Sequence, residues 1–149
     1  MKRFIAIVIV VFIIIVIIYN AVIIKRQKEI MQIKAYNYEY EQYNGGEMYG
    51  TDVITIINKA IDQNKKEGIS KNVKGQFMDD GEKSIIAEIV LITDEDLKQK
   101  KSYRMESIDK LGIISFKDNF NTAKFKLNEI DYHTKSGRVS KIVLEQQYE

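Results

Sequence analysis

The first apolar stretch of the chain is continuous rather than periodic. The segment "FIAIVIVVFIIIVIIYNAVII", Phe4 to Ile24, contains no formally charged residue. A helix of this length, at about 1.5 Å per residue, matches the thickness of the hydrocarbon layer of a bilayer. We therefore expect residues 1–24 to be a transmembrane anchor, with residues 4–24 in the membrane. A buried core helix is a poor alternative, because a helix that is apolar all round needs protein on every side.

After the anchor the pattern acquires a helical period. No Pro or Gly occurs from Lys25 to Tyr43. Spacings of three, four and three residues place four side chains on one helical stripe: Ile33, Tyr36, Tyr40 and Tyr43. Alternation over Tyr36, Tyr38 and Tyr40 is the competing strand pattern, but it explains fewer of these residues. Residues 25–46 are thus predicted to form a juxtamembrane helix or stalk that ends at a double glycine, and the stripe is its candidate interaction surface.

Residues 47–149 are predicted to form the globular domain, and its first element is a second helix. Thr51 is a candidate N-cap, and Asp52 places a negative charge at the positive end of the helix dipole. An apolar stripe follows: Val53, Ile57, Ala60 and Ile61. The run from Asn64 to Gly68 carries stop signals.

The segments after this helix have mostly strand-like and turn-like patterns. We expect a short strand over Val73–Met78, a hairpin turn over Asp79–Lys83, an apolar strand over Ser84–Thr93, a polar loop over Asp94–Lys101, and a short helix over Met105–Leu111 closed by Gly112.

The C-terminal part alternates from Ala123 to Leu127, and the apolar phase then shifts by one residue. The shift predicts a β-bulge near Asn128–Glu129. A turn over Thr134–Arg138 and a last strand over Val139–Leu144 follow. The predicted fold class is therefore α+β: a transmembrane helix extended into a juxtamembrane helix, and a second helix packed on an antiparallel sheet of about four strands.

Charge and composition exclude several classes of function. The chain has 23 Lys and Arg residues against 21 Asp and Glu residues, and Lys2 and Arg3 alone account for the surplus of +2. The domain is therefore neutral, whereas a nucleic-acid-binding domain is expected to be basic, so we expect no nucleic-acid partner. The absence of cysteine removes thiolate nucleophiles and every cysteine-based metal site.

The orientation of the anchor is predicted from its flanks. Counting Lys and Arg slightly favours a cytoplasmic domain, because Lys25, Arg26, Lys28 and Lys34 follow the apolar run. A very short tail before a long apolar run is instead typical of a signal-anchor, and we expect an extracytoplasmic domain on a single-pass membrane protein. A cleaved signal peptide is the other alternative, but the apolar run is long for one and no pair of small residues marks a cleavage site.

No residue pattern indicates catalysis. His133 is the single histidine, and we expect it to be a solvated turn residue, since nothing in the sequence supplies a nucleophile for it. Asp79 and Asp80 precede a glycine, which is typical of a turn rather than of a calcium loop. The glycines near Gly50 lack the Lys-Ser/Thr of a phosphate-binding loop. We expect no enzyme activity, no cofactor site and no metal site.

The segments "YGTDVITIINKAIDQN", "KLGIISFKDNF" and "DYHTKSGRVSKIVLEQ" resemble an uncharacterised group of short, N-terminally membrane-anchored proteins of Gram-positive bacteria. That resemblance implies the layout and no activity. The architecture is also similar to type IV pilins and pseudopilins, although their processing glycine and the glutamate that follows it are missing before Glu29. The sequence thus predicts an anchored, non-catalytic binding or scaffold protein with a protein partner or a second copy, and a pilin-like subunit is the alternative.

Overall fold

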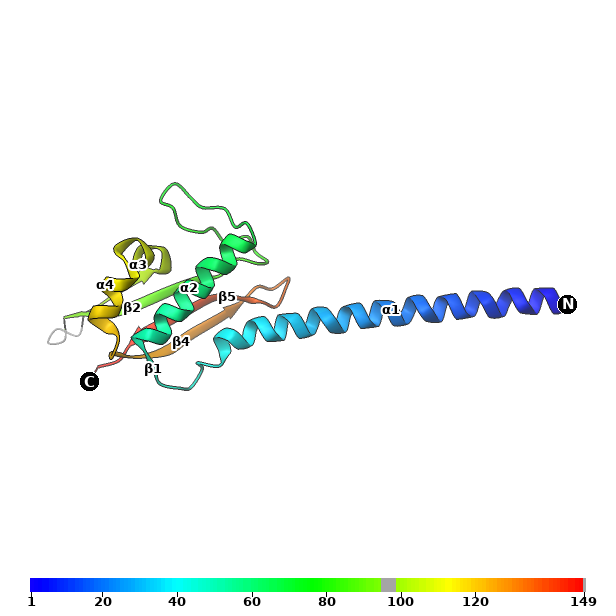
Figure 1. Cartoon of the computed structure of the whole chain (residues 1–149), viewed down its shortest axis with the longest axis horizontal. Coiled ribbons are helices and arrows are strands. Elements are labelled where there is room, and N and C mark those ends of the chain that lie inside the picture. The colour runs from blue at the N-terminus through cyan, green and yellow to red at the C-terminus, as the bar shows by residue number, and fades with distance from the viewer. Residues whose placement is uncertain (95–98, 149) are drawn as a thin grey trace. The chain divides into compact units, whose positions relative to one another are not determined.

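The computed structural model describes residues 1–94 and 99–148, with the backbone alone at residues 2, 3 and 6. The chain divides into two compact units, Met1–Ala35 and Tyr36–Glu149. Helix α1, Lys2–Glu41, begins in the first unit and ends in the second (Figure 1). The globular unit therefore includes the last turns of this helix.

The first unit consists of α1 alone, and most of its described apolar side chains are exposed. Within Phe4–Ile24, the exposed large apolar side chains range from 42% exposure at Val16 to 71% at Phe4. In a bilayer such side chains contact lipid, and the helix satisfies its own backbone polar groups. One N-terminal helix is thus long and apolar enough to span a membrane, as a single-pass anchor requires.

The globular unit has an α+β fold, as predicted. Its elements among the described residues, after the end of α1, are β1 Met48–Tyr49, α2 Gly50–Lys66, β2 Ile86–Asp94, β3 Gln99–Arg104, α3 Met105–Leu111, α4 Ile113–Phe120, β4 Lys124–Tyr132 and β5 Val139–Gln146. Helices α2, α3 and α4 lie on one face of the sheet (Figure 1).

The sheet has five strands in the order β1-β4-β5-β2-β3, and it is mixed rather than purely antiparallel. β4 and β5 form an antiparallel hairpin, and β5 then lies beside β2 in a parallel pair. A parallel pair needs a long connection, which β3, α3, α4 and β4 provide. The predicted antiparallel sheet of about four strands is therefore corrected in its strand count and in this one pairing.

One face of the sheet packs on the helices, and the other carries charges. Ala87, Ile89 and Leu91 alternate along β2 toward the core, where Val53 and Ile57 of α2 are fully buried. Between them, Glu88 points to the other face and pairs with Lys141 at 3.6 Å. This alternation is what a strand with one covered face requires.

Several local predictions are confirmed. Helix α3 ends at Gly112, whose φ of +101° is accessible to glycine, and the turn before β5 contains Gly137 at φ +70°. The register of β4 against β5 shifts between Leu127 and Glu129, where a bulge was expected.

The predicted strand over Val73–Met78 is wrong, so the turn over Asp79–Lys83 does not join two strands of a hairpin. Asn72 Oδ1 accepts hydrogen bonds from the backbone N–H groups of Lys74 and Gln76, which closes a tight loop instead. Only an isolated bridge joins Lys71 and Phe77. The loop is held by a buried glutamate, because Glu106 Oε1 accepts the Phe77 N–H at 2.8 Å.

Two further segments differ from expectation. Of the polar loop predicted over Asp94–Lys101, residues 95–98 lie outside the described part of the chain, and Gln99–Lys101 belongs to β3. Helix α4 was not predicted. It follows α3 after a single glycine, and its eight residues are too few to show a clear helical period.

Candidate functional site

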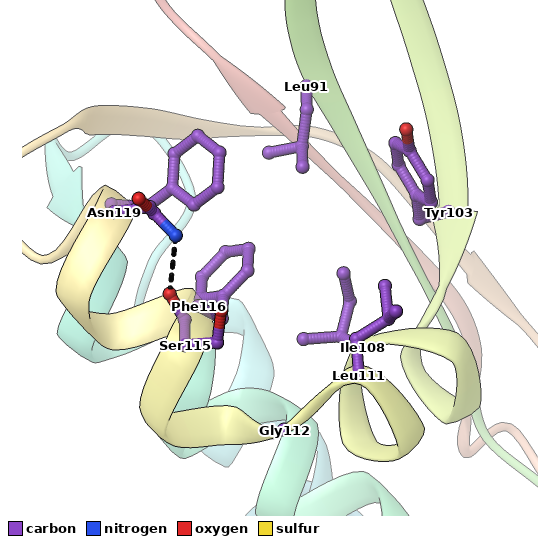
Figure 2. Close-up of a pocket in the computed structure, with 9 residues that line it drawn as sticks. Leu91, Tyr103, Ile108, Leu111, Gly112, Ser115, Phe116 and Asn119 are labelled. Carbon is purple, nitrogen blue, oxygen red and sulfur yellow. Dashed lines mark hydrogen bonds between the residues drawn. The ribbon is translucent and has the colours of Figure 1, made fainter.

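A groove of about 310 Å³ opens between α3, α4 and the edge of the sheet. Figure 2 shows the side chains of β2, β3 and the two helices converging on it. Its lining residues are Leu91, Tyr103, Ile108, Leu111, Gly112, Ser115, Phe116, Asn119 and Phe120. We call this site the α3–α4 groove.

The local sequence explains how the groove forms. Gly112 ends α3 and directly precedes α4, so the two helices change direction at one residue. Ile108 of α3 and Phe116 of α4 are both buried, at 3% and 6% exposure. Phe116 also packs on Phe120, with ring centroids 4.9 Å apart. The apolar faces of two short helices thus form one continuous surface.

One lining residue of the groove exposes a large apolar side chain, since Leu111 is 72% exposed. Ile114 of α4 is 77% exposed, but it is not among the described lining residues. An exposed leucine beside an apolar hollow offers apolar area that binding would remove from water.

The polar groups of the groove are few and uncharged. Asn119 Nδ2 donates to the Ser115 carbonyl oxygen at 2.8 Å, so this amide is partly satisfied within its own helix (Figure 2). No Asp, Glu, His, Lys or Arg is among the described lining residues. The arrangement suits the binding of an apolar group.

A second hollow beside the end of α1 is larger, at about 510 Å³, but it is polar. Its lining includes Gly45 and Gly46, and two other lining residues, Lys124 and Glu47, form a salt bridge at 3.4 Å. An apolar hollow with few polar groups is the better binding-site candidate, so we favour the α3–α4 groove.

The predicted stripe is divided between the two units. Ile33 belongs to the first unit, whereas its three tyrosines lie in the globular unit. Tyr40 is only 3% exposed and belongs to the core, and Tyr36 and Tyr43 pack against that core. Tyr38, which lies off the stripe, is 65% exposed. The tyrosines therefore contact their own domain, and a role of the stripe in binding a partner stays a prediction.

Tyr36 lies at the centre of this packing. Its hydroxyl donates to the Val139 carbonyl oxygen at 3.3 Å, and the Arg138 guanidinium lies 4.1 Å from its ring centroid. Its ring meets that of Tyr40 edge to face, at 5.5 Å between centroids. Burial raises the pKa of Tyr36 to about 12, against the attraction of Arg138 for the phenolate. Burial also raises the pKa of Tyr40.

His133 is not the solvated residue that the sequence predicted. It is 5% exposed, and its Nε2 lies 2.7 Å from the carbonyl oxygen of Ser84. The cause is the loop before β2, which covers the end of β4: Ser136 Oγ donates to the Glu82 carbonyl oxygen at 2.6 Å. The residues next to His133 in the sequence are mostly polar and predict exposure, but the distant loop before β2 buries its side chain.

The predicted turn at Asp79 and Asp80 is present. Asp80 Oδ1 accepts backbone N–H groups from Glu82, Lys83 and Ser84. Burial alone would raise the pKa of Asp80, but these hydrogen bonds outweigh it and hold the pKa well below its usual range. The carboxylate therefore organises its own loop.

No family model matches the chain, and no curated protein or solved structure is significantly similar to it. The functional assignment therefore depends on the geometry of the site.

Sequence reasoning missed the groove, although "LGII", Leu111–Ile114, gave a signal. This segment has three large apolar residues around one glycine, which is more than one face of a short amphipathic helix can bury.

Proposed function

We propose that this protein is a single-pass, membrane-anchored binding protein whose extracytoplasmic α+β domain holds an apolar side chain of a partner protein in the α3–α4 groove. The observation that carries the proposal is the exposure of Leu111 in the lining of an apolar hollow. A hollow of about 310 Å³ suits one large side chain or a short acyl group better than a cofactor.

Strand β3 supports a protein partner. It is the last strand of the sheet order, so one of its edges is free of strand pairing within the described residues. Tyr103 of this strand lines the groove. An extended peptide that pairs with a free edge and inserts an alternate side chain into a neighbouring pocket is a common recognition mode.

The chemistry of the groove supports a non-catalytic role. Its described lining carries no carboxylate, imidazole or amine. Enzymes of the acid–base and nucleophilic classes need such groups within hydrogen-bond reach of one another. Binding is the function that the lining supports best.

A pilin-like structural subunit is the second candidate. The continuous helix α1, which runs from an apolar segment into the α+β domain, favours it. Sequencing the N-terminus of the mature protein separates the two, because prepilin-type processing removes a leader. An intact Met1 supports the binding protein, and a processed N-terminus that begins an apolar helix supports the pilin-like subunit.

The groove proposal is tested by photo-crosslinking in cells that express the full chain. A benzophenone amino acid replaces Leu111 in one variant and Val73 in the control, since Val73 is fully exposed and distant in sequence from the groove. We expect a discrete protein adduct from position 111 and none from position 73. A third variant adds Ser115→Trp, which fills the groove from an exposed position, and it should abolish the adduct.

The opposite results would overturn the proposal. Equal adducts from positions 111 and 73 would show that contact is non-specific. An adduct that survives Ser115→Trp would place the partner outside the groove, and no adduct from position 111 would leave the groove without a protein ligand. Thermal unfolding of each variant verifies that the domain remains folded.

A further inference from the structure

Three potential metal ligands from two distant segments meet on the globular unit. Asp79 and Asp80 come from the loop before β2, and His133 follows the end of β4. One ligand atom from each residue lies within 4.8 Å of the other two. This cluster is separate from the α3–α4 groove and shares no residue with it.

The hydrogen bonding of His133 determines which ring nitrogen is free. The Ser84 carbonyl oxygen only accepts, so Nε2, at 2.7 Å from it, must carry a proton. In the neutral imidazole, Nδ1 then bears a lone pair. Metal-binding histidines are oriented in the same way, with the second nitrogen donating to a carbonyl or carboxylate.

The free nitrogen points at a carboxylate. His133 Nδ1 lies 3.8 Å from Asp79 Oδ1, and the His133 side chain is 3% exposed. Within the described part of the chain Nδ1 has no hydrogen bond. Two groups that both accept hydrogen bonds therefore face each other, an arrangement that a cation between them would stabilise.

The two carboxylates keep one oxygen each for a ligand. Asp79 Oδ1 accepts the Gly81 N–H at 2.8 Å and the Ser84 hydroxyl at 2.9 Å, and the loop uses Oδ1 of Asp80 in the same way. No described residue donates to either Oδ2. The Asp79 side chain is 61% exposed, so water can complete a coordination shell.

We propose that His133 Nδ1, Asp79 and Asp80 bind a divalent first-row transition cation such as Zn²⁺. Imidazole nitrogen suits Zn²⁺ and its neighbours, whereas Ca²⁺ and Mg²⁺ prefer all-oxygen sites. Three protein ligands leave at least one position for water. Closing the ligand separation to coordination distance requires small rotations of the two carboxylates, which are exposed at the surface.

A bound cation would join two parts of the domain that already touch. Lys135 pairs with Glu82 at 3.3 Å, and Ser136 Oγ donates to the Glu82 carbonyl oxygen. These contacts link the turn before β5 to the loop before β2. The cation adds a third link, and by linkage it stabilises the folded domain against unfolding.

The test uses the full chain in detergent micelles, prepared without a histidine tag. Because His133 is the only histidine, its ring nitrogens give a single pair of ¹⁵N resonances. Titration with ZnCl2 should move the Nδ1 resonance, saturate at one equivalent and raise the unfolding temperature. Asp79→Asn keeps the Oδ1 acceptor but loses the charge, and it should weaken Zn²⁺ binding at least about tenfold.

Asp118→Asn is the matched control, since Asp118 is an exposed aspartate outside the cluster, and it should bind Zn²⁺ as the wild type does. An Nδ1 resonance that stays unchanged in millimolar Zn²⁺ would overturn the proposal. Equal binding by Asp79→Asn would remove the carboxylate from the site. Ca²⁺ that binds as tightly as Zn²⁺ would overturn the assigned class of cation.

Discussion

At the scale of single residues, the interior of the domain depends on buried amides. Asn64 is fully buried near the end of α2. Its Nδ2 donates to the Ile85 carbonyl oxygen at 2.7 Å, and its Oδ1 accepts the Ile85 N–H at 2.8 Å. Asn37 joins the end of α1 to the start of β5 in the same way, through Gly137 and Val139. Each amide pairs with two backbone groups, and the Ile85 groups that Asn64 binds are fully buried.

Asn64→Ala is therefore expected to destabilise the domain by about 3 kcal/mol, because it leaves a buried donor and a buried acceptor without partners. Urea unfolding of the full chain in micelles measures the change. Asn58→Ala, on the exposed face of the same helix, is the control and should stay within about 0.5 kcal/mol of the wild type. Equal effects of the two substitutions would refute the role of Asn64.

The buried phenol of Tyr36 predicts a dependence of stability on alkaline pH. Its pKa is about 12 in the folded domain and 10.0 when unperturbed, chiefly because burial disfavours the phenolate. The unfolded chain therefore loses this proton first, and stability falls as pH rises from about 10 to 12. Tyr36→Phe should lose less stability than the wild type over this interval in thermal melts. An identical loss in both proteins would contradict the prediction.

Residue burial was the hardest property to predict from the sequence. The helical spacing correctly separated Tyr38, which is exposed, from Tyr36 and Tyr40. The local pattern predicted Asn64 only as a helix stop and His133 only as a turn residue, yet both are buried. Their burial depends on Ser84 and Ile85, which are distant in the chain, so local pattern carries no signal for it.

At the scale of elements, the close approach of α2 and α4 depends on one glycine. A Cβ added to Gly50 would lie 1.9 Å from the Phe120 carbonyl oxygen and 2.6 Å from its carbonyl carbon. Both are backbone atoms, so a side chain at position 50 must move one helix away from the other.

Gly50→Ala is expected to destabilise the domain by about 2 kcal/mol or more through this overlap. Gly46→Ala has open space around the added methyl group and no left-handed backbone to strain, so it should be neutral or slightly stabilising. Both effects are read from unfolding temperatures. A harmless Gly50→Ala would show that the α2–α4 contact is looser than described.

Elements with a long, regular apolar pattern were predictable from the sequence, and elements that depend on residues distant in the chain were not. The stripe of α2 and the run of β2 give their own signals. Val73–Met78 is as apolar as a short strand, but Asn72 and Gly75 close it into a loop. Strand β3 is rich in charged residues and therefore gives no apolar strand pattern, although such residues are common in an edge strand, which pairs on one side only. The shape of the α3–α4 groove could not be predicted for the same reason, since the groove requires β3 and α4 together.

At the scale of the whole molecule, the two units differ in how many of their apolar residues are exposed. The first unit exposes the apolar segment Phe4–Ile24, and the second buries most of its apolar residues. A helix of this kind is stable in a bilayer, where it satisfies its own backbone polar groups. The chain therefore fits a domain tethered to a membrane surface, on which our proposed function depends.

The most direct test of this account is the sidedness of the domain. The chain contains no cysteine, so Val73→Cys introduces a single thiol at a fully exposed position. In cells that express the full chain, the account predicts that a membrane-impermeant maleimide labels this cysteine in the membrane fraction without permeabilisation. Labelling that occurs only after the cells are permeabilised would place the domain in the cytoplasm and contradict the account.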